Sequence, residues 1–162
     1  NSGPNGLKSL LKRIPSIDFA IVGEPTLMKA AVAEKGLVVC DCIIRGKASH
    51  AAHPNSENPI LKISHIIKSI EKIRFKKISK LLGPVKLTIT QINAGTQHNV
   101  VPSSVEIVID VRVNDLYSNE EIVELIKENV NAEVYPRSMD LNSSSISNNH
   151  PIVKAVNEIG IP

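Results

Sequence analysis

The sequence predicts an α/β protein of the α+β sandwich type, built on a split βαββαβ, ferredoxin-like unit. Its four-stranded antiparallel sheet should carry two helices on one face. Between residues 37 and 135, strand-like and helix-like segments follow one another in the order strand, helix, strand, strand, helix, strand. Each helical segment has one apolar stripe, and both stripes can be buried only against the same face of such a sheet.

The first half of this unit is a strand followed by a long helix. Residues 37–46 are rich in β-branched side chains, which favours a strand. A polar loop follows, and Pro59 suits the first turn of a helix because its missing N–H would be unpaired there. The apolar residues of this segment recur at helical spacing: Ile60, Ile63, Ile66, Ile67, Ile70 and Ile73.

The second half is a hairpin, a helix and a short strand. Apolar and polar residues alternate in 85–92 and again in 105–111, as in half-buried strands. Ser118 and Glu121 have the spacing of a capping box, which predicts that a helix begins there. Residues 132–135 complete the unit as its last strand.

Two flanking segments lie outside this unit. Residues 6–13 and 150–159 have helical patterns, whereas 18–22 and 28–34 read as strands, the first of them buried. We therefore expect three parts: residues 1–35 and 138–162 belong to a second domain, and residues 36–137 are inserted into it. Because the chain starts without an initiator methionine, we also expect it to be an internal piece of a longer protein.

Composition and charge exclude several classes of function. Hydrophobic residues make up 42% of the chain but aromatic residues only 2%, so Ile, Val, Leu and Ala must build the core. The net charge of +3 is too small to indicate nucleic-acid binding, and no apolar run is long enough to cross a membrane. Cys40 and Cys42 lie two apart in a strand, too far for an unstrained disulfide, so we expect reduced thiols in a cytoplasmic protein.

Polar residues at the ends of the predicted strands are the candidates for chemistry. Glu24 follows a predicted buried strand, where α/β sheets place active-site carboxylates, although a turn glutamate can also be purely structural. His50 and His53 lie in the loop after residue 46, where a histidine can bind a metal or donate to an oxyanion, or can simply be exposed.

Two further groups of residues come from the hairpin and the strand after it. Gly95 permits the turn, but Thr96 and Asn99 are not needed for it, which favours ligand contacts over a solvated loop. Asp110 and Arg112 share one face of a strand. An arginine there can clamp a carboxylate, or can serve only in a cross-strand ion pair.

The segments VGEPT, GKASHAAHP, INAGTQHNVVP and DVR, taken together, resemble the M20 family of zinc amidohydrolases and peptidases. They occur in that family's order and spacing over essentially the whole chain. The resemblance is strongest to its branch of acetylornithine deacetylase-like and succinyl-diaminopimelate desuccinylase-like enzymes. It implies that residues 36–137 are the lid and dimerisation domain, and that the flanks belong to the catalytic domain.

The resemblance implies roles for individual residues. Glu24 matches a carboxylate ligand of a two-zinc site, which cobalt can also occupy. His50 matches the histidine that reaches from one subunit into the partner's active site. Asn99 and Arg112 match residues that hold the substrate carboxylate, and Gly95 and Thr96 match the loop beside them.

The implied protein is a homodimer that deacylates N-acyl amino acids, with N-acetyl- or N-succinyl-ornithine as the expected substrate. The family's other metal ligands and its general base have no counterparts here, so we expect this chain alone to be inactive. His53 and His98 match no required role. The alternative is a non-catalytic ferredoxin-like module that dimerises or binds a small molecule.

Overall fold

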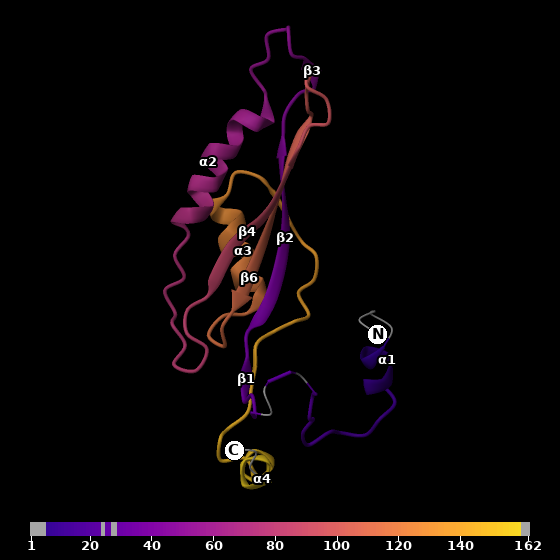
Figure 1. Cartoon of the computed structure of the whole chain (residues 1–162), viewed down its shortest axis with the longest axis vertical. Coiled ribbons are helices and arrows are strands. Elements are labelled where there is room, and N and C mark those ends of the chain that lie inside the picture. Colours follow the sequence, from indigo (N-terminus) through magenta and orange to yellow (C-terminus); the bar gives the residue numbers. More distant parts are fainter. Residues whose placement is uncertain (1–5, 24, 27–28, 160–162) are drawn as a thin grey trace.

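The computed structural model describes residues 6–23, 25–26 and 29–159. They form an elongated molecule in which one long strand, β2 (Gly36–Arg45), runs along most of the sheet (Figure 1). The main sheet also contains β4 (Lys86–Ala94), β6 (Ser104–Val113) and β7 (Glu133–Pro136). Its helices are α2 (Pro59–Lys72) and α3 (Asn119–Asn129).

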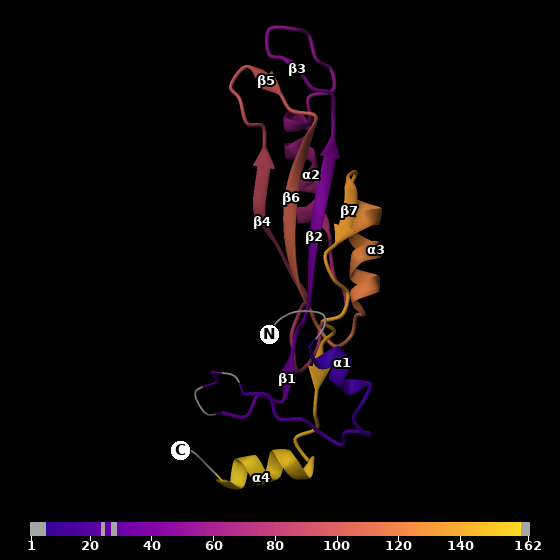
Figure 2. The same cartoon turned by 90° about the vertical axis from the view of Figure 1, so that its right-hand side faces the viewer.

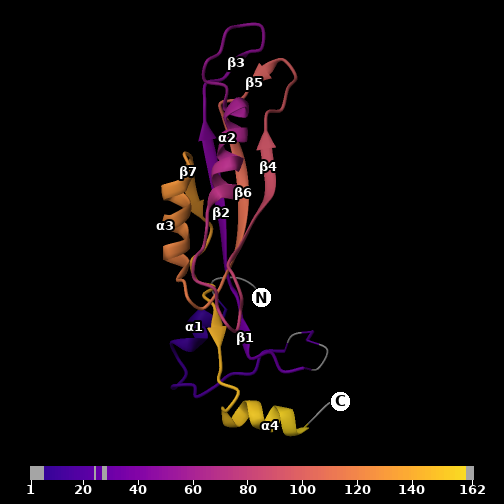
Figure 3. The same cartoon turned by 90° about the vertical axis from the view of Figure 1, so that its left-hand side faces the viewer.

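The main sheet has the strand order β4-β6-β2-β7, and every neighbouring pair is antiparallel. The elements follow one another as β2, α2, β4, β6, α3 and β7, which is the predicted split βαββαβ order. Figure 2 shows the four strands side by side with the helices behind them, and Figure 3 shows both helices in front. The predicted fold is therefore confirmed, including the placement of both helices on one face.

The core lies between this face and the two helices. Val38, Cys40, Cys42 and Ile44 point into it from β2, and the odd-numbered residues from Val105 to Val113 point into it from β6. The helices contribute the apolar residues Ile66, Ile70, Ile122, Val123 and Ile126. Isoleucine and valine dominate this core, as the scarcity of aromatic residues required.

Both helices begin with a side-chain cap. Asn58 accepts a hydrogen bond from the N–H of Ile60 and precedes Pro59 at the start of α2. Ser118 and Glu121 form the predicted capping box of α3, with bonds of 2.8 and 3.1 Å between side chain and backbone. These caps satisfy N–H groups that have no partner within the helix.

β4 departs from simple alternation at one point. Its register against β6 shifts between Ile89 and Gln91, so that Ile89 pairs with Ile109 and Ile92 pairs with Ile107. This bulge places both isoleucines on the helix-bearing face although three positions separate them. Ile92 nevertheless remains 46% exposed, because β4 is an edge strand.

The opposite face of the sheet carries ion pairs. Arg137 of the β7 end binds Asp41 of β2 with N–O distances of 2.8 to 3.0 Å. Arg45 of β2 binds Glu133 of β7, which also accepts from the Tyr135 hydroxyl. These contacts lower the pKa of Glu133 and raise the pKa of Arg137 through hydrogen bonding.

The flanks lie at the end of the molecule where β2 begins (Figure 1). They contain α1 (Leu7–Leu11), β1 (Ala33–Glu34), β8 (Ser144–Ser145) and α4 (Pro151–Ile159). β1 and β8 pair with each other. The helices predicted in both flanks are confirmed.

The expectation of a buried strand at residues 18–22 is wrong. These residues form no strand, and Ile21 and Val22 are 72% and 75% exposed. An apolar run becomes a strand only where neighbours accept its backbone hydrogen bonds, and the described residues offer it none. In the predicted strand 28–34, only Ala33 and Glu34 pair, while Met28 lies outside the described residues.

Candidate functional site

The predicted catalytic histidine lies at the tip of the molecule, at the far end from the flanks (Figure 2). β3 (Ser49–His50) pairs with β5 (Val100–Val101) in a small separate sheet, where His50 lies opposite Val100. The N–H of Ala51 donates to the carbonyl of Asn99 at 2.9 Å. The structure therefore brings together the two motifs that contain His50 and Asn99, which are far apart in sequence.

The imidazole of His50 is exposed and oriented by its own loop. Its Nδ1 accepts a hydrogen bond from the N–H of Ala52 at 3.2 Å. A neutral imidazole that accepts at Nδ1 carries its proton on Nε2, so the ring presents an N–H donor. The ring of His53 packs against it edge to face, with centroids 5.8 Å apart.

One asparagine side chain holds the His50 loop in place. Asn55 donates to the Lys47 carbonyl at 2.8 Å and to the Ser49 hydroxyl at 2.7 Å, and it accepts from the N–H of Glu57. Sequence reasoning missed Asn55. The signal was the run Pro-Asn-Ser-Glu-Asn, because asparagines in loops commonly bond to neighbouring backbone groups.

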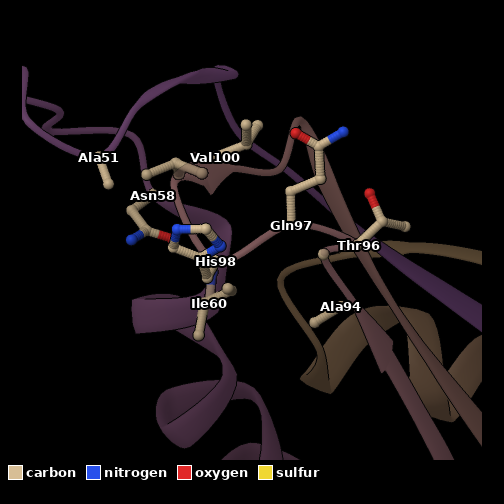
Figure 4. Close-up of a pocket in the computed structure, with 10 residues that line it drawn as sticks. Ala51, Asn58, Ile60, Ala94, Thr96, Gln97, His98 and Val100 are labelled. Atoms are coloured by element: carbon tan, nitrogen blue, oxygen red, sulfur yellow. The ribbon is translucent and has the colours of Figure 1, made fainter.

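A pocket of about 490 Å³ opens beside this tip, between the hairpin loop and the start of α2 (Figure 4). In Figure 4 the His98 ring lies close to Asn58 and Ile60, while Thr96 and Gln97 lie on the other side. Gly95 has a φ of +64°, the left-handed conformation that glycine adopts readily and that this turn requires. Gly95, Thr96 and His98 therefore line one concave surface.

Arg112 lies at the other end of the main sheet. It pairs with Leu37 at the start of β2 and with Lys86 at the start of β4. The strand from Ser104 to Arg112 alone spans about 27 Å at the usual rise per residue. His50 and Asn99 form one group and Arg112 another, so a single chain cannot bring all three to one small substrate.

The Arg112 guanidinium is paired with Asp110 on the same strand. Its Nε lies 2.9 Å from one carboxylate oxygen and its Nη2 lies 3.3 Å from the other. Arg112 is 52% exposed and remains accessible from solvent.

The described residues do not supply a metal site. They contain no cluster of three or more histidine, cysteine or acidic side chains that could hold a metal ion. Cys40 and Cys42 are free and buried, and burial raises their pKa values to about 11 and about 12, which disfavours the thiolate that binds metals. Glu24, the predicted zinc ligand, lies outside the described residues.

The part of the chain that the structure describes has no helix long and apolar enough to cross a membrane.

Comparison with known proteins gives several sequence relatives that share one name. The chain is 31% identical over 135 residues to a succinyl-diaminopimelate desuccinylase of Rickettsia felis. This alignment covers 76% of the chain and 35% of that protein. It is 30% identical over 149 residues to one of Ehrlichia ruminantium, covering 88% and 39%. The chain therefore spans about a third of the length of the curated relatives that it matches.

Solved structures share the fold at lower identity. An M20 family metallo-carboxypeptidase from Sulfolobus solfataricus matches with a TM-score of 0.62 at 15% identity, over 79% of this chain and 50% of that one. A tripeptidase from Staphylococcus aureus matches with a TM-score of 0.52 at 20% identity, over 78% and 35%. The family model described as "Peptidase dimerisation domain" matches residues 32–138. The chain therefore belongs to the M20 peptidase dimerisation-domain family.

Proposed function

We propose that this chain is the lid and dimerisation segment of a metal-dependent amidohydrolase that removes the acyl group from N-acyl amino acids. In this proposal, residues 36–137 form the lid, and 1–35 and 138–162 are segments of the catalytic domain. The observation that carries it is the tip, where a histidine oriented as an N–H donor is held beside Asn99. Such a donor suits the developing oxyanion of an amide under attack.

The proposed substrate class rests on the names of the relatives and on the positive charge of Arg112. Relatives at about 30% identity are named succinyl-diaminopimelate desuccinylases, which supports an N-succinyl amino acid. N-acetyl- or N-succinyl-ornithine, expected from the motifs, remains a candidate. All of these molecules carry an α-carboxylate, which Arg112 can bind through charge-assisted hydrogen bonds.

The separation of His50 from Arg112 supports an active site shared between two subunits. Two identical edge strands related by a two-fold axis run antiparallel, so the tip of one lid lies beside the flank end of the other. In such a cytoplasmic homodimer, His50 and Asn99 come from one subunit and Arg112 from its partner. His50 then polarises the scissile carbonyl while Arg112 binds the carboxylate.

The metal is proposed to be zinc, with cobalt as the alternative. The described residues do not fit a metal by themselves, since they hold no cluster of ligands. Glu24 would therefore bind the metal together with residues outside this sequence. The lid would contribute no ligand to the metal site.

A purely structural dimerisation or ligand-binding module is the second candidate function. The same lack of a metal-ligand cluster among the described residues favours it. It predicts dimers and no hydrolysis.

The decisive experiment is hydrolysis by the complete protein that contains this segment. The protein is freed of metal with a chelator, reloaded with zinc or cobalt, and offered N-succinyl-diaminopimelate, N-succinylornithine and N-acetylornithine. We expect metal-dependent release of the free amine, fastest from an N-succinyl substrate. Absence of hydrolysis with every metal and substrate would favour the structural module instead.

A further inference from the structure

Asp110 and Arg112 form an ion pair that connects no two elements of the fold. Two other Arg–carboxylate pairs of the described residues lie on this face and join β2 to the β7 region, across 88 and 96 residues of sequence. The Asp110–Arg112 pair instead joins two positions on β6 that are two residues apart. It therefore cannot hold strands together, and its direct effect is on the direction of the Arg112 side chain.

We propose that Asp110 is a positioning residue that holds the Arg112 guanidinium side-on, so that its outer edge is presented to the carboxylate of a ligand. This inference rests on the proposed role of Arg112 in substrate binding. The carboxylate of Asp110 occupies the edge formed by Nε and Nη2. A guanidinium has five N–H donors in a planar fork, so Nη1 and the second hydrogen of Nη2 still form an edge for a bidentate carboxylate.

The surroundings of the pair admit a second anion. Lys86 lies directly opposite Arg112 on β4, so a second basic residue belongs to this end of the same face. Asp110 is 25% exposed and Arg112 is 52% exposed, which leaves the outer part of the guanidinium open to solvent. Leu37 lies opposite Arg112 on the other side and offers an apolar wall. These neighbours suit a carboxylate attached to an aliphatic chain.

Asp110 affects ligand binding by Arg112 in two ways, through the orientation of the guanidinium and through its own negative charge. A free arginine side chain samples many rotamers and loses that freedom on binding, whereas one already held in place loses less. Removing Asp110 also removes a negative charge near the ligand, which by itself would strengthen anion binding. The two effects have opposite signs, so the direction of the change in KM distinguishes them.

The test is Asp110→Asn in the complete protein, with Asp41→Asn as a matched control. Asp41 binds Arg137 on the same face but away from Arg112. The side chains of Asp41 and Arg137 are 23% and 52% exposed, close to the values for Asp110 and Arg112. We expect Asp110→Asn to raise KM for the carboxylate substrate by about tenfold with kcat unchanged. An analogue with its α-carboxylate converted to an amide should show no such rise. Asp110→Glu should restore most of the loss, and Asp41→Asn should leave KM unchanged.

Three results would overturn the proposal. A lower KM in Asp110→Asn would mean that Asp110 only repels the substrate. An equal rise for the carboxylate and the amide would mean a general structural effect, as would an equal rise in Asp41→Asn.

A second measurement keeps this inference separate from the proposed function. Succinate is titrated into the 162-residue chain, and the Arg112 Nε–H signal is followed by NMR. We expect that signal to move on binding, and the affinity to fall several-fold in Asp110→Asn. A shift without hydrolase activity in the complete protein would support the positioning role while the proposed function fails. No shift at Arg112, or tighter binding in Asp110→Asn, would overturn the positioning role itself.

Discussion

Single side chains determine which groups this chain presents and in which direction. His50 is oriented through its Nδ1, Asn55 holds the loop around it, and Arg112 is held by Asp110. His50 and Arg112 could be selected from the sequence, because histidine and arginine at strand ends are not required for folding. Asn55 and the backbone N–H that orients His50 could not be selected, because which groups lie within reach depends on the folded loop.

If the proposed function holds, replacement of Arg112 by alanine should weaken substrate binding in the complete protein. The loss of a charge-assisted bidentate pair costs on the order of 2–4 kcal/mol, which should raise KM by tens- to hundreds-fold. Steady-state kinetics with a carboxylate substrate and its amide analogue measure this. An equal loss for both would show that Arg112 does not bind the carboxylate.

Glu121 makes stability depend on pH. The Ser118 backbone N–H and the Lys77 ammonium both donate to its carboxylate, and they hold its pKa below the ordinary 4.5. A lowered pKa in the folded state stabilises the protein above the ordinary pKa, and this contribution is lost as the pH falls through the lowered value. Glu121→Gln should therefore be less stable than the wild type at neutral pH.

Urea denaturation of both proteins at pH 7 and at about pH 2.5 tests this expectation. The difference between them should shrink at the lower pH, where the wild-type carboxylate becomes protonated. A difference that stays constant with pH would contradict the assigned interaction.

Elements whose signals lie within a short stretch of sequence were predictable. The period of the isoleucines predicts α2, and the Ser118–Glu121 spacing predicts the start of α3. Residues 18–22 show the limit, because their apolar character resembles a strand but a strand also needs neighbours. The bulge in β4 was not predictable either, since it depends on pairing with β6.

The junction between β2 and the tip leaves no room for a side chain. An added Cβ at Gly46 would collide with the carbonyl of Glu57 and the ring of Pro59. We therefore expect Gly46→Ala to displace the His50 loop and to cost about 1–3 kcal/mol of stability. Gly23→Ala is the control, because nothing lies within 4 Å of its added Cβ. Equal stability of the two variants in urea denaturation would refute the close contact.

The edge of the main sheet bears on the proposed dimer. β4 is an edge strand, and Ile92 on it is 46% exposed on the face that carries the helices. An exposed strand edge with apolar side chains is suited to pairing with a second copy. The sequence alone predicted a dimer through the lid, but the distance between His50 and Arg112 became clear only from the length of β6.

We expect Ile92→Asp to weaken dimerisation by at least about tenfold, because a buried unpaired charge is costly at an apolar interface. Leu81→Asp is the matched control, since Leu81 is 53% exposed and lies outside β4. Sedimentation at several concentrations measures both variants. Dimers of Ile92→Asp as tight as those of the control would place the interface elsewhere.

The central claim is that the tip of one subunit completes the active site of the other. Complementation in the complete protein tests it most directly, with Glu24→Ala in one subunit and His50→Ala in the other. Each homodimer should be nearly inactive, since the loss of an oxyanion donor costs roughly 10²–10³ in turnover. If His50 acts across the dimer, one site of each mixed dimer is intact. A random mixture then recovers about a quarter of wild-type activity. Recovery of no activity, in a preparation shown to contain mixed dimers, would mean that His50 serves its own subunit and would contradict the claim.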